Sequence, residues 1–256
     1  MALIQCSFFS EVLALSCSMN VIIPQKTGKG QIGIKTVTEE KTKYPVLYLL
    51  HGMSDDHSIW LRRTSIERYV SEYPLVVIMP AVARSFYTDM ASGPRYWSFI
   101  SEELPEIVKN FFPVSEKRED NFAAGLSMGG YGAFKLALRK SERFSAAGSF
   151  SGALTLDWMR TNKERELETK SIFGEKLKEE DDLLRISQKL AKTNKVKPRL
   201  YQSCGTEDFL YQENLKFKKH LEKLGYDLSY SERPGSHEWG FWDIEIQKFL
   251  KWLNLK

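Results

Sequence analysis

The segment at residues 121–140 (NFAAGLSMGGYGAFKLALRK) constrains the fold of this chain more than any other. Residues 121–125 are small and apolar, as in a buried strand, and residues 129–140 predict a helix that follows directly. Gly125-Leu126-Ser127-Met128-Gly129 joins the two. Such a sharp turn holds its central residue in a strained conformation, and side chains two positions to either side would collide. The segment therefore predicts an exposed serine where a buried strand ends.

The rest of the chain repeats the pattern of a buried strand followed by a helix. Apolar runs predict further strands at 46–50, 75–80, 144–152 and 199–205, and the β-rich segments 3–13, 17–23 and 228–232 add others. Helices are expected near 63–72, 98–111, 210–223 and 239–253. This alternation predicts an α/β protein with a mostly parallel, doubly wound sheet flanked by helices. We expect a single domain over residues 1–256, with a charged, cap-like insertion at 153–195.

A serine on such a turn can act as a nucleophile only if a base removes its proton. Of the four histidines, two precede the serine and His220 lies within a predicted helix. In the α/β-hydrolase fold the order is serine, acid, histidine, and the histidine follows the last core strand. His237, in RPGSHEW, has that position. We therefore predict Ser127 as the nucleophile and His237 as its base.

Two adjacent carboxylates compete for the role of the acid. Glu207 and Asp208 both follow the strand predicted at 199–205, in CGTEDFLY. The acid must hold the imidazole tautomer and stabilise the imidazolium ion. Neighbouring loop residues rarely point the same way, and we favour Asp208, with Glu207 as the alternative.

His51-Gly52-Met53 directly follows the strand predicted at 46–50. In the α/β-hydrolase fold an HG segment here presents a backbone N–H to the developing oxyanion, together with the amide that follows the nucleophile. The predicted oxyanion donors are therefore the N–H groups of Met53 and Met128.

Charge and hydropathy exclude several classes of partner. The chain has 37 Lys and Arg residues and 33 Asp and Glu residues, and these are interspersed, so no basic face for nucleic acid is predicted. No apolar run approaches the ~20 residues needed to span a bilayer, and the N-terminus lacks the basic region of a signal peptide. We expect neither nucleic acid nor membrane as a partner.

The three cysteines, Cys6, Cys17 and Cys204, match no metal-binding spacing. Isolated cysteines in a chain of this length are typical of reduced thiols, which favours a cytoplasmic location. No cluster of His, Asp and Glu has metal-ligand spacing either, so no metal site is predicted.

Glycines at 28, 30 and 33 follow the G-x-G-x-x-G order of dinucleotide-binding loops. That motif needs a helix that begins at the glycines. Here β-branched and then charged residues follow, up to Pro45, and we interpret the segment as an exposed hairpin loop.

Four motifs, HGMSDDHSIW, GLSMGGYGAFKLAL, CGTEDFLY and HEWGFW, resemble the esterase D family over nearly the whole chain. Within that family they are most similar to the small bacterial tributyrin and acetyl esterases. The resemblance implies a carboxylesterase that hydrolyses short-chain acyl esters, from acetyl to butyryl, through a Ser-His-Asp acyl-enzyme mechanism. It also implies no cofactor, and a homo-oligomer.

Several alternatives remain open. Trp60, Trp97 and Trp239 could form a flat aromatic wall that binds substrate in a feruloyl-type aryl esterase. A carbohydrate acetyl esterase is another alternative. S-formylglutathione hydrolases share the S-M-G-G turn, but they typically carry a histidine where Tyr131 stands, and a cysteine near the HG loop. An acyltransferase would use the same three catalytic residues, and a non-catalytic binding protein on this scaffold would be expected to lose one of them.

Overall fold

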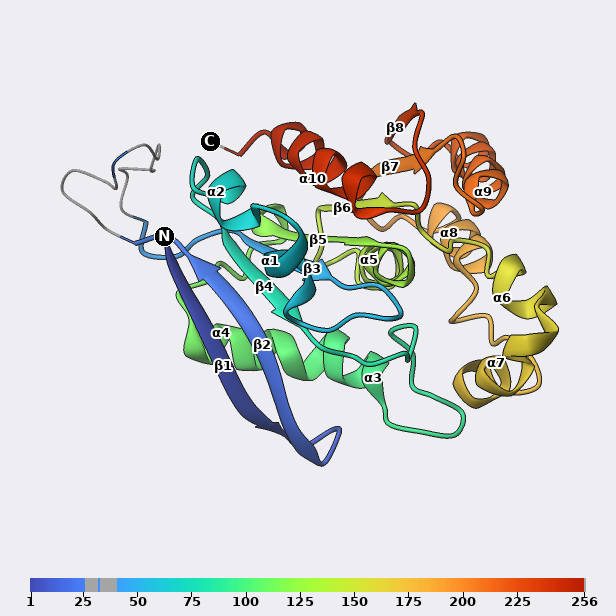
Figure 1. The fold of residues 1–256 in the computed structure, drawn as a ribbon, viewed down its shortest axis with the longest axis horizontal. Helices are drawn as coiled ribbons and strands as arrows, with labels where there is room; N and C mark the ends of the chain where they lie inside the picture. The colour runs from blue at the N-terminus through green and yellow to red at the C-terminus, as the bar shows by residue number, and fades with distance from the viewer. Residues whose placement is uncertain (26–31, 33–40, 256) are drawn as a thin grey trace.

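The computed structural model describes residues 1–25, 32 and 41–255. Glycines 28, 30 and 33, with the hairpin loop expected around them, lie outside the described residues. Figure 1 shows a central sheet with helices on both of its faces.

Eight strands in the described part of the chain form one sheet, in the order β1-β2-β4-β3-β5-β6-β7-β8. They are β1 (Ala2–Ser10), β2 (Leu15–Ile23), β3 (Val46–Leu50), β4 (Val76–Pro80), β5 (Asn121–Leu126), β6 (Ala146–Phe150), β7 (Arg199–Gly205) and β8 (Leu228–Arg233). The strands from β4 to β8 in this order pair in parallel, whereas β1 with β2, and β2 with β4, pair antiparallel. The predicted mostly parallel sheet of an α/β-hydrolase fold is confirmed.

The helical segments connect these strands. They are α1 (Ile59–Arg63), α2 (Ile66–Val70), α3 (Tyr96–Ser98), the π-helical turn η1 (Phe99–Glu103), α4 (Leu104–Phe111), the 3-10 turn η2 (Arg118–Asp120), α5 (Met128–Arg139), α6 (Asp157–Thr161), the 3-10 turn η3 (Lys163–Arg165), α7 (Glu166–Phe173), α8 (Leu183–Ala191), α9 (Tyr211–Lys223) and α10 (Trp239–Leu253). α5 lies on one face of the sheet, and α10 lies on the other (Figure 1).

Two of these helices differ from the sequence prediction for local reasons. The helix expected near 63–72 is two short helices, because Thr64 is extended and its hydroxyl donates to the Trp60 carbonyl and accepts from the Ile66 N–H. The helix expected at 98–111 contains the π-helical turn, since Pro105 has no N–H to donate to the Ser101 carbonyl. That carbonyl accepts instead from the Arg143 guanidinium at 2.6 Å.

Alternating side chains of the central strands supply two separate cores. Val46, Tyr48 and Leu50 of β3 pack into the core beneath α4, α5, α8 and α9. Leu47 and Leu49, which point the other way, pack into the core beneath α1, α2 and α10. Because both cores share one sheet, we keep the proposal of a single domain.

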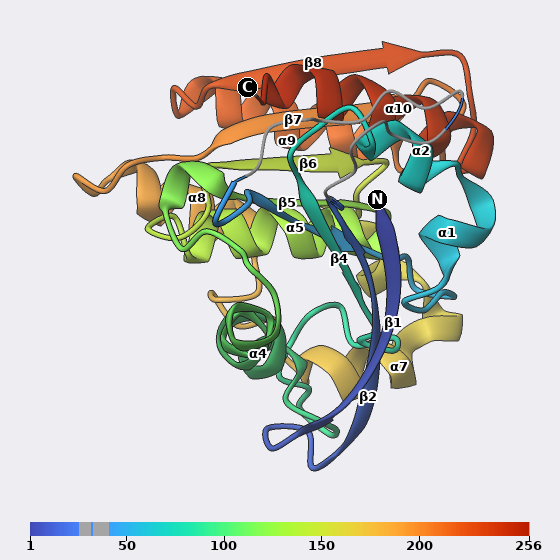
Figure 2. The same cartoon turned by 90° about the vertical axis from the view of Figure 1, so that its left-hand side faces the viewer.

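The insertion at 153–195 contributes α6, η3, α7 and α8. α8 packs against α5, whereas α6 and α7 lie beyond the edge of the helical layer (Figures 1 and 2). Figure 2 also shows the β1–β2 hairpin extending away from the rest of the sheet. None of the helices in the described ranges is both long enough and apolar enough to cross a membrane.

Candidate active site

Ser127 lies on a strained turn between β5 and α5. Its φ of 53° and ψ of −119° are rare for a residue with a side chain, and its N–H donates to the Phe150 carbonyl at 2.9 Å. A Cβ on Gly125 would lie 2.5 Å from the backbone of Gly129, and a Cβ on Gly129 would lie 2.5 Å from the Leu50 carbonyl oxygen. The glycines predicted from the motif are therefore required by close backbone approach.

His237 joins Ser127 to a buried carboxylate. Its Nε2 lies 3.0 Å from Ser127 Oγ, and its Nδ1 lies 2.9 Å from Asp208 Oδ2 and 3.1 Å from Oδ1. The Asp208 side chain is fully buried, and its Oδ1 also accepts from the Leu210 N–H at 2.8 Å. A carboxylate at Nδ1 leaves Nε2 free to accept a proton from the serine.

Glu207 and Asp208, the two candidates for the acid, differ in whether they contact the imidazole. Glu207 is exposed and its oxygens pair with the Thr206 hydroxyl and the Gly235 N–H, so it supports the loop before His237 without contacting the imidazole. The pKa of Glu207 is lowered, chiefly by its hydrogen bond from Thr206 and then by the one from Gly235.

His51 orients the peptide that carries the predicted Met53 donor. Its Nε2 accepts from the Val82 N–H at 3.0 Å, so Nδ1 carries the proton and donates to the Gly52 carbonyl at 2.6 Å. Burial lowers the pKa of His51 to about 4, and the ring is neutral at physiological pH. Because a trans peptide directs its N–H opposite to its C=O, anchoring the Gly52 carbonyl fixes the direction of the Met53 N–H.

The second predicted donor is the first residue of α5. The N–H groups in the first turn of a helix have no partner within the helix, and they carry its positive dipole end. The Met128 N–H directly follows Ser127, the predicted nucleophile, which is the position that acyl-transfer chemistry requires of an oxyanion donor.

A cavity of about 620 Å³ opens above Ser127 and His237, and its wall is mainly apolar. Phe209 packs on the His237 ring at 4.7 Å between centroids, and Trp242 meets the same ring edge-on at 4.9 Å. Trp158 of α6 packs against Phe209 at 5.2 Å. The insertion thus supplies one wall of the cavity.

The three tryptophans proposed as substrate contacts have different positions. Trp239 lines the cavity. Trp60 is 1% exposed, donates its indole N–H to the Leu50 carbonyl and lies behind Trp239 at 5.3 Å. Trp97 is 8% exposed and lies against Lys135 and Arg139, and neither it nor Trp60 is among the described residues that line the cavity.

Charged residues at the cavity were not predicted from the sequence. Arg84 and Arg165 both line it, and both donate to the Glu168 carboxylate, at 2.6 and 2.9 Å. Arg165 also lies 4.9 Å from the Trp158 ring and 3.9 Å from the Met53 sulfur. The sequence offers no signal for this cluster, because Arg84 and Glu168 are 84 positions apart.

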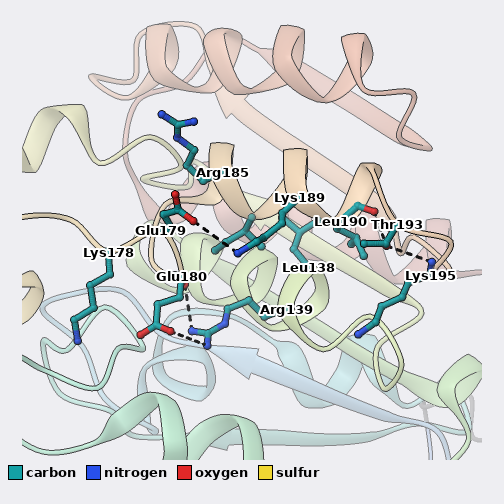
Figure 3. A pocket seen from close by; sticks show the side chains of 11 residues that line it. Leu138, Arg139, Lys178, Glu179, Glu180, Arg185, Lys189, Leu190, Thr193 and Lys195 are labelled. Carbon is teal, nitrogen blue, oxygen red and sulfur yellow. Dashed lines mark hydrogen bonds and ion pairs between the residues drawn. The ribbon is translucent and has the colours of Figure 1, made fainter.

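A second hollow, of about 660 Å³, lies between the end of α5 and α8, and Figure 3 shows its lining. Arg139 is paired there with Glu180, and Lys189 with Glu179, while Leu138, Ile186 and Leu190 also line it. No serine, histidine or cysteine is among its described lining residues, so the proposed Ser127 and His237 pair lies in the first cavity and not in this hollow. Among the residues that the structure places, no group of three or more His, Cys, Asp and Glu could hold a metal ion.

Comparisons with known proteins show the family and the fold to which this chain is similar. The model of the family described as "Putative esterase" matches residues 29–253. An acetyl esterase from Caldicellulosiruptor saccharolyticus is 30% identical over 99% of this chain and 98% of its own length. The substrate-bound fluorophosphonate-binding serine hydrolase F (FphF) of Staphylococcus aureus is 33% identical, with a TM-score of 0.88, over 98% of both chains. The S-formylglutathione hydrolase (FrmB) of the same organism is 33% identical, with a TM-score of 0.86, over 98% of both chains.

The first prediction concerns the nucleophile. Ser127→Ala is expected to lower kcat for an acyl ester on the order of 10⁴ to 10⁶-fold, because Ser127 Oγ is the one hydroxyl among the described residues that is held within hydrogen-bond distance of the His237 Nε2. A fluorophosphonate probe should label Ser127 and not Ser54, which also lines the cavity. Mass spectrometry of the labelled peptide tests this, and labelling of Ser54 would contradict the assignment.

The second prediction ranks the two carboxylates. Asp208→Asn should lower kcat about 10⁴-fold, because an amide at Nδ1 can favour the wrong imidazole tautomer. Glu207→Gln is the matched control and should change kcat only a few-fold, since the Glu207 carboxylate bonds to Thr206 and Gly235 and not to the imidazole. Steady-state kinetics on both variants, with circular dichroism to confirm folding, decides the matter, and the reverse ranking would exclude Asp208.

Proposed function

The chain belongs to the esterase family and is a serine-type ester hydrolase, and we propose that it hydrolyses short-chain acyl esters, from acetyl to butyryl. The observation that carries the proposal is the 3.0 Å contact between Ser127 Oγ and His237 Nε2, with Asp208 on the opposite ring nitrogen. The similarity to an acetyl esterase over 99% of the chain supports the acyl class.

The proposed mechanism follows from the position of each group. Ser127 Oγ attacks the ester carbonyl carbon while His237 Nε2 accepts its proton, and Asp208 stabilises the resulting imidazolium ion. The carbonyl oxygen, now negatively charged, accepts hydrogen bonds from the Met53 and Met128 N–H groups. His237 then donates its proton to the leaving alcohol oxygen, which leaves an acyl group on Ser127. Water, deprotonated by His237, attacks the acyl carbonyl carbon. The bond from that carbon to Ser127 Oγ then breaks as His237 returns the proton to Oγ, which releases the carboxylic acid.

The form of the cavity supports a short acyl group. Its 620 Å³ must hold both sides of the ester, and the insertion closes one wall through the contact of Trp158 with Phe209. The Glu168 carboxylate, between Arg84 and Arg165, ties the insertion to the loop after β4. We propose that Trp239, Trp158, Phe209 and Trp242 contact substrate, whereas Trp60 acts only as support behind Trp239.

Three alternative substrates and one alternative reaction would use the same three residues. A feruloyl or sugar-acetyl ester would suit the aromatic wall of Trp158 and Trp239. A glutathione thioester is less favoured, because the Tyr131 hydroxyl is engaged by the Asp181 carbonyl at 2.6 Å, and Cys6, Cys17 and Cys204 are not among the described lining residues of the cavity. An acyltransferase would differ only in replacing water by an alcohol, and product analysis with added alcohol distinguishes it.

The third prediction concerns acyl length. Each methylene that becomes buried stabilises binding by about 0.8 kcal/mol, so kcat/KM should rise from acetyl to butyryl and fall once the chain meets the cavity wall. We expect p-nitrophenyl butyrate to be hydrolysed at least about tenfold more efficiently than the octanoate. Trp158→Ala should shift the preference toward longer chains, relative to the acetyl ester of the same variant. A wild-type maximum at octanoyl or above would refute the proposal, and methyl ferulate and S-formylglutathione in the same panel test the alternatives.

We also propose that the protein is a homo-oligomer that pairs through β1. This nine-residue strand lies at one end of the sheet and contains no charged residue and no proline. Natural edge strands usually carry charges, proline or bulges that prevent pairing with another chain. The other end of the sheet follows that rule, since β8 is shorter and carries Glu232 and Arg233. A second copy of β1, antiparallel to the first, would pair the free edges of both.

The fourth prediction tests this edge. Ser7 is exposed at the middle of β1, so Ser7→Lys would place like charges close together across a two-fold axis and should yield monomers. Ser16→Lys on the neighbouring strand β2 is the control and should leave the assembly intact. Light scattering coupled to size-exclusion chromatography measures the mass, and a monomeric wild-type protein would contradict the proposal.

We propose the cytoplasm as the compartment of this enzyme. The three cysteines are free thiols in the structure, and unpaired cysteines are typical of proteins in a reducing environment. Fractionation of cells that express the tagged protein tests this.

A further inference from the structure

A buried cation lies on the same helix as the nucleophile, and the mechanism above does not use it. Lys135 is fully buried, eight positions after Ser127, and its Nζ lies 2.6 Å from Asp181 Oδ1. Asp181 belongs to the insertion and is itself 3% exposed. Burial lowers the pKa of Lys135 to about 8, while the Asp181 carboxylate acts to raise it. A buried ion pair is costly to desolvate, and an apolar pair of similar volume would often be at least as stable.

The remaining hydrogen bonds of the ammonium hold the loop after β4. Lys135 Nζ donates to the Tyr87 carbonyl at 3.0 Å and to the Thr88 hydroxyl at 2.8 Å. Phe86 and Tyr87 both have φ near +50°, a conformation that persists only where the surroundings impose it. The ammonium therefore anchors a strained loop to α5.

Tyr87 connects this loop to the HG segment. Its ring packs against Gly132, which has no room for a Cβ, and its hydroxyl donates to the His51 carbonyl at 2.9 Å. His51 in turn donates to the Gly52 carbonyl, which shares its peptide with the Met53 N–H. A set of hydrogen bonds, joined through the covalent structure of Tyr87 and His51, thus connects Asp181 in the insertion to the peptide of the predicted oxyanion donor.

We propose that Lys135 is a positioning residue for the oxyanion hole, acting through Tyr87 and His51 on the direction of the Met53 N–H. The inference rests on the proposed ester hydrolysis and extends it to a residue that touches neither the substrate nor the catalytic serine. It also gives the insertion a second role, because Asp181 supplies the counter-charge that holds Lys135 in place.

Disrupting these hydrogen bonds should destabilise the transition state rather than weaken substrate binding. A backbone donor is useful only when it points at the position that the oxyanion will occupy, and removing one donor outright typically costs about 10² to 10³ in kcat. Removing a hydrogen bond that only orients the donor should lower kcat less, by about tenfold, and should change KM by less than about twofold.

The test uses a variant that removes only one hydrogen bond of the set. Tyr87→Phe keeps the ring against Gly132 and removes the hydroxyl bonded to His51. We expect kcat for p-nitrophenyl butyrate to fall about tenfold, and the affinity for butylboronic acid, which forms a tetrahedral adduct with the serine, to fall by a similar factor. Tyr226→Phe is the matched control, since this buried tyrosine donates to the Ser187 carbonyl at 2.8 Å and should leave both values unchanged.

A second variant addresses the cation itself. Lys135→Gln combined with Asp181→Asn replaces the ion pair by two neutral amides that can still bond to each other. We expect the same loss of kcat, and no further loss when Tyr87→Phe is added, because all three changes act along one set of hydrogen bonds.

Three outcomes would overturn the inference. They are a kcat within twofold of wild type in folded Tyr87→Phe, a rise in KM at unchanged kcat, and losses that add fully in the triple variant. If the double variant does not fold, Tyr87→Phe decides alone. A wild-type protein that hydrolyses none of the acyl esters would refute the proposed function instead, and this inference with it.

Discussion

The backbone conformation of Ser127 is the constraint on which the rest of the site depends. A residue with a side chain adopts a φ of 53° only where its surroundings impose it. Here the N–H of Ser127 is bonded to Phe150 on the next strand, and two glycines let α5 approach the end of β3. The strain is therefore balanced by packing of the central sheet, and it places the hydroxyl above the sheet, clear of its own helix.

The sheet then determines where the partners of Ser127 can lie. His51, Ser127, Asp208 and His237 follow β3, β5, β7 and β8, and the carboxyl ends of these parallel strands share one edge of the sheet. Ligands in open α/β sheets bind outside that edge. Alternating residues of β3 pack into two separate cores, which keep the strands in register. The distances between the segments that carry these four residues are therefore set by buried residues outside the proposed site.

Much of this arrangement could be predicted from the sequence, because it depends on local pattern and on chain order. The strand–turn–helix around Ser127 has its own sequence signature, and His237 and Asp208 follow from their places after the late strands. The tryptophans could not be placed in the same way. Trp60 is held in the core by its hydrogen bond to the Leu50 carbonyl, and Trp97 lies against the cations of α5. Trp158, Phe209 and the pair Arg84 and Glu168 meet only through long-range packing of the insertion.

The residues of the proposed site lie far apart in the sequence, and this separation determines when the site can form during folding. Ser127 and His237 are 110 positions apart, and the His237 ring packs against Trp242 of α10, the last helix of the described chain. A chain that emerges from the ribosome presents its N-terminal strands first, and contacts of high sequence separation form late. During synthesis the turn that carries Ser127 can therefore fold while the segment that carries its proposed base, His237, is still being made. We therefore expect the folding chain to gain its proposed reactivity toward acyl groups only when α10 docks and holds the His237 ring.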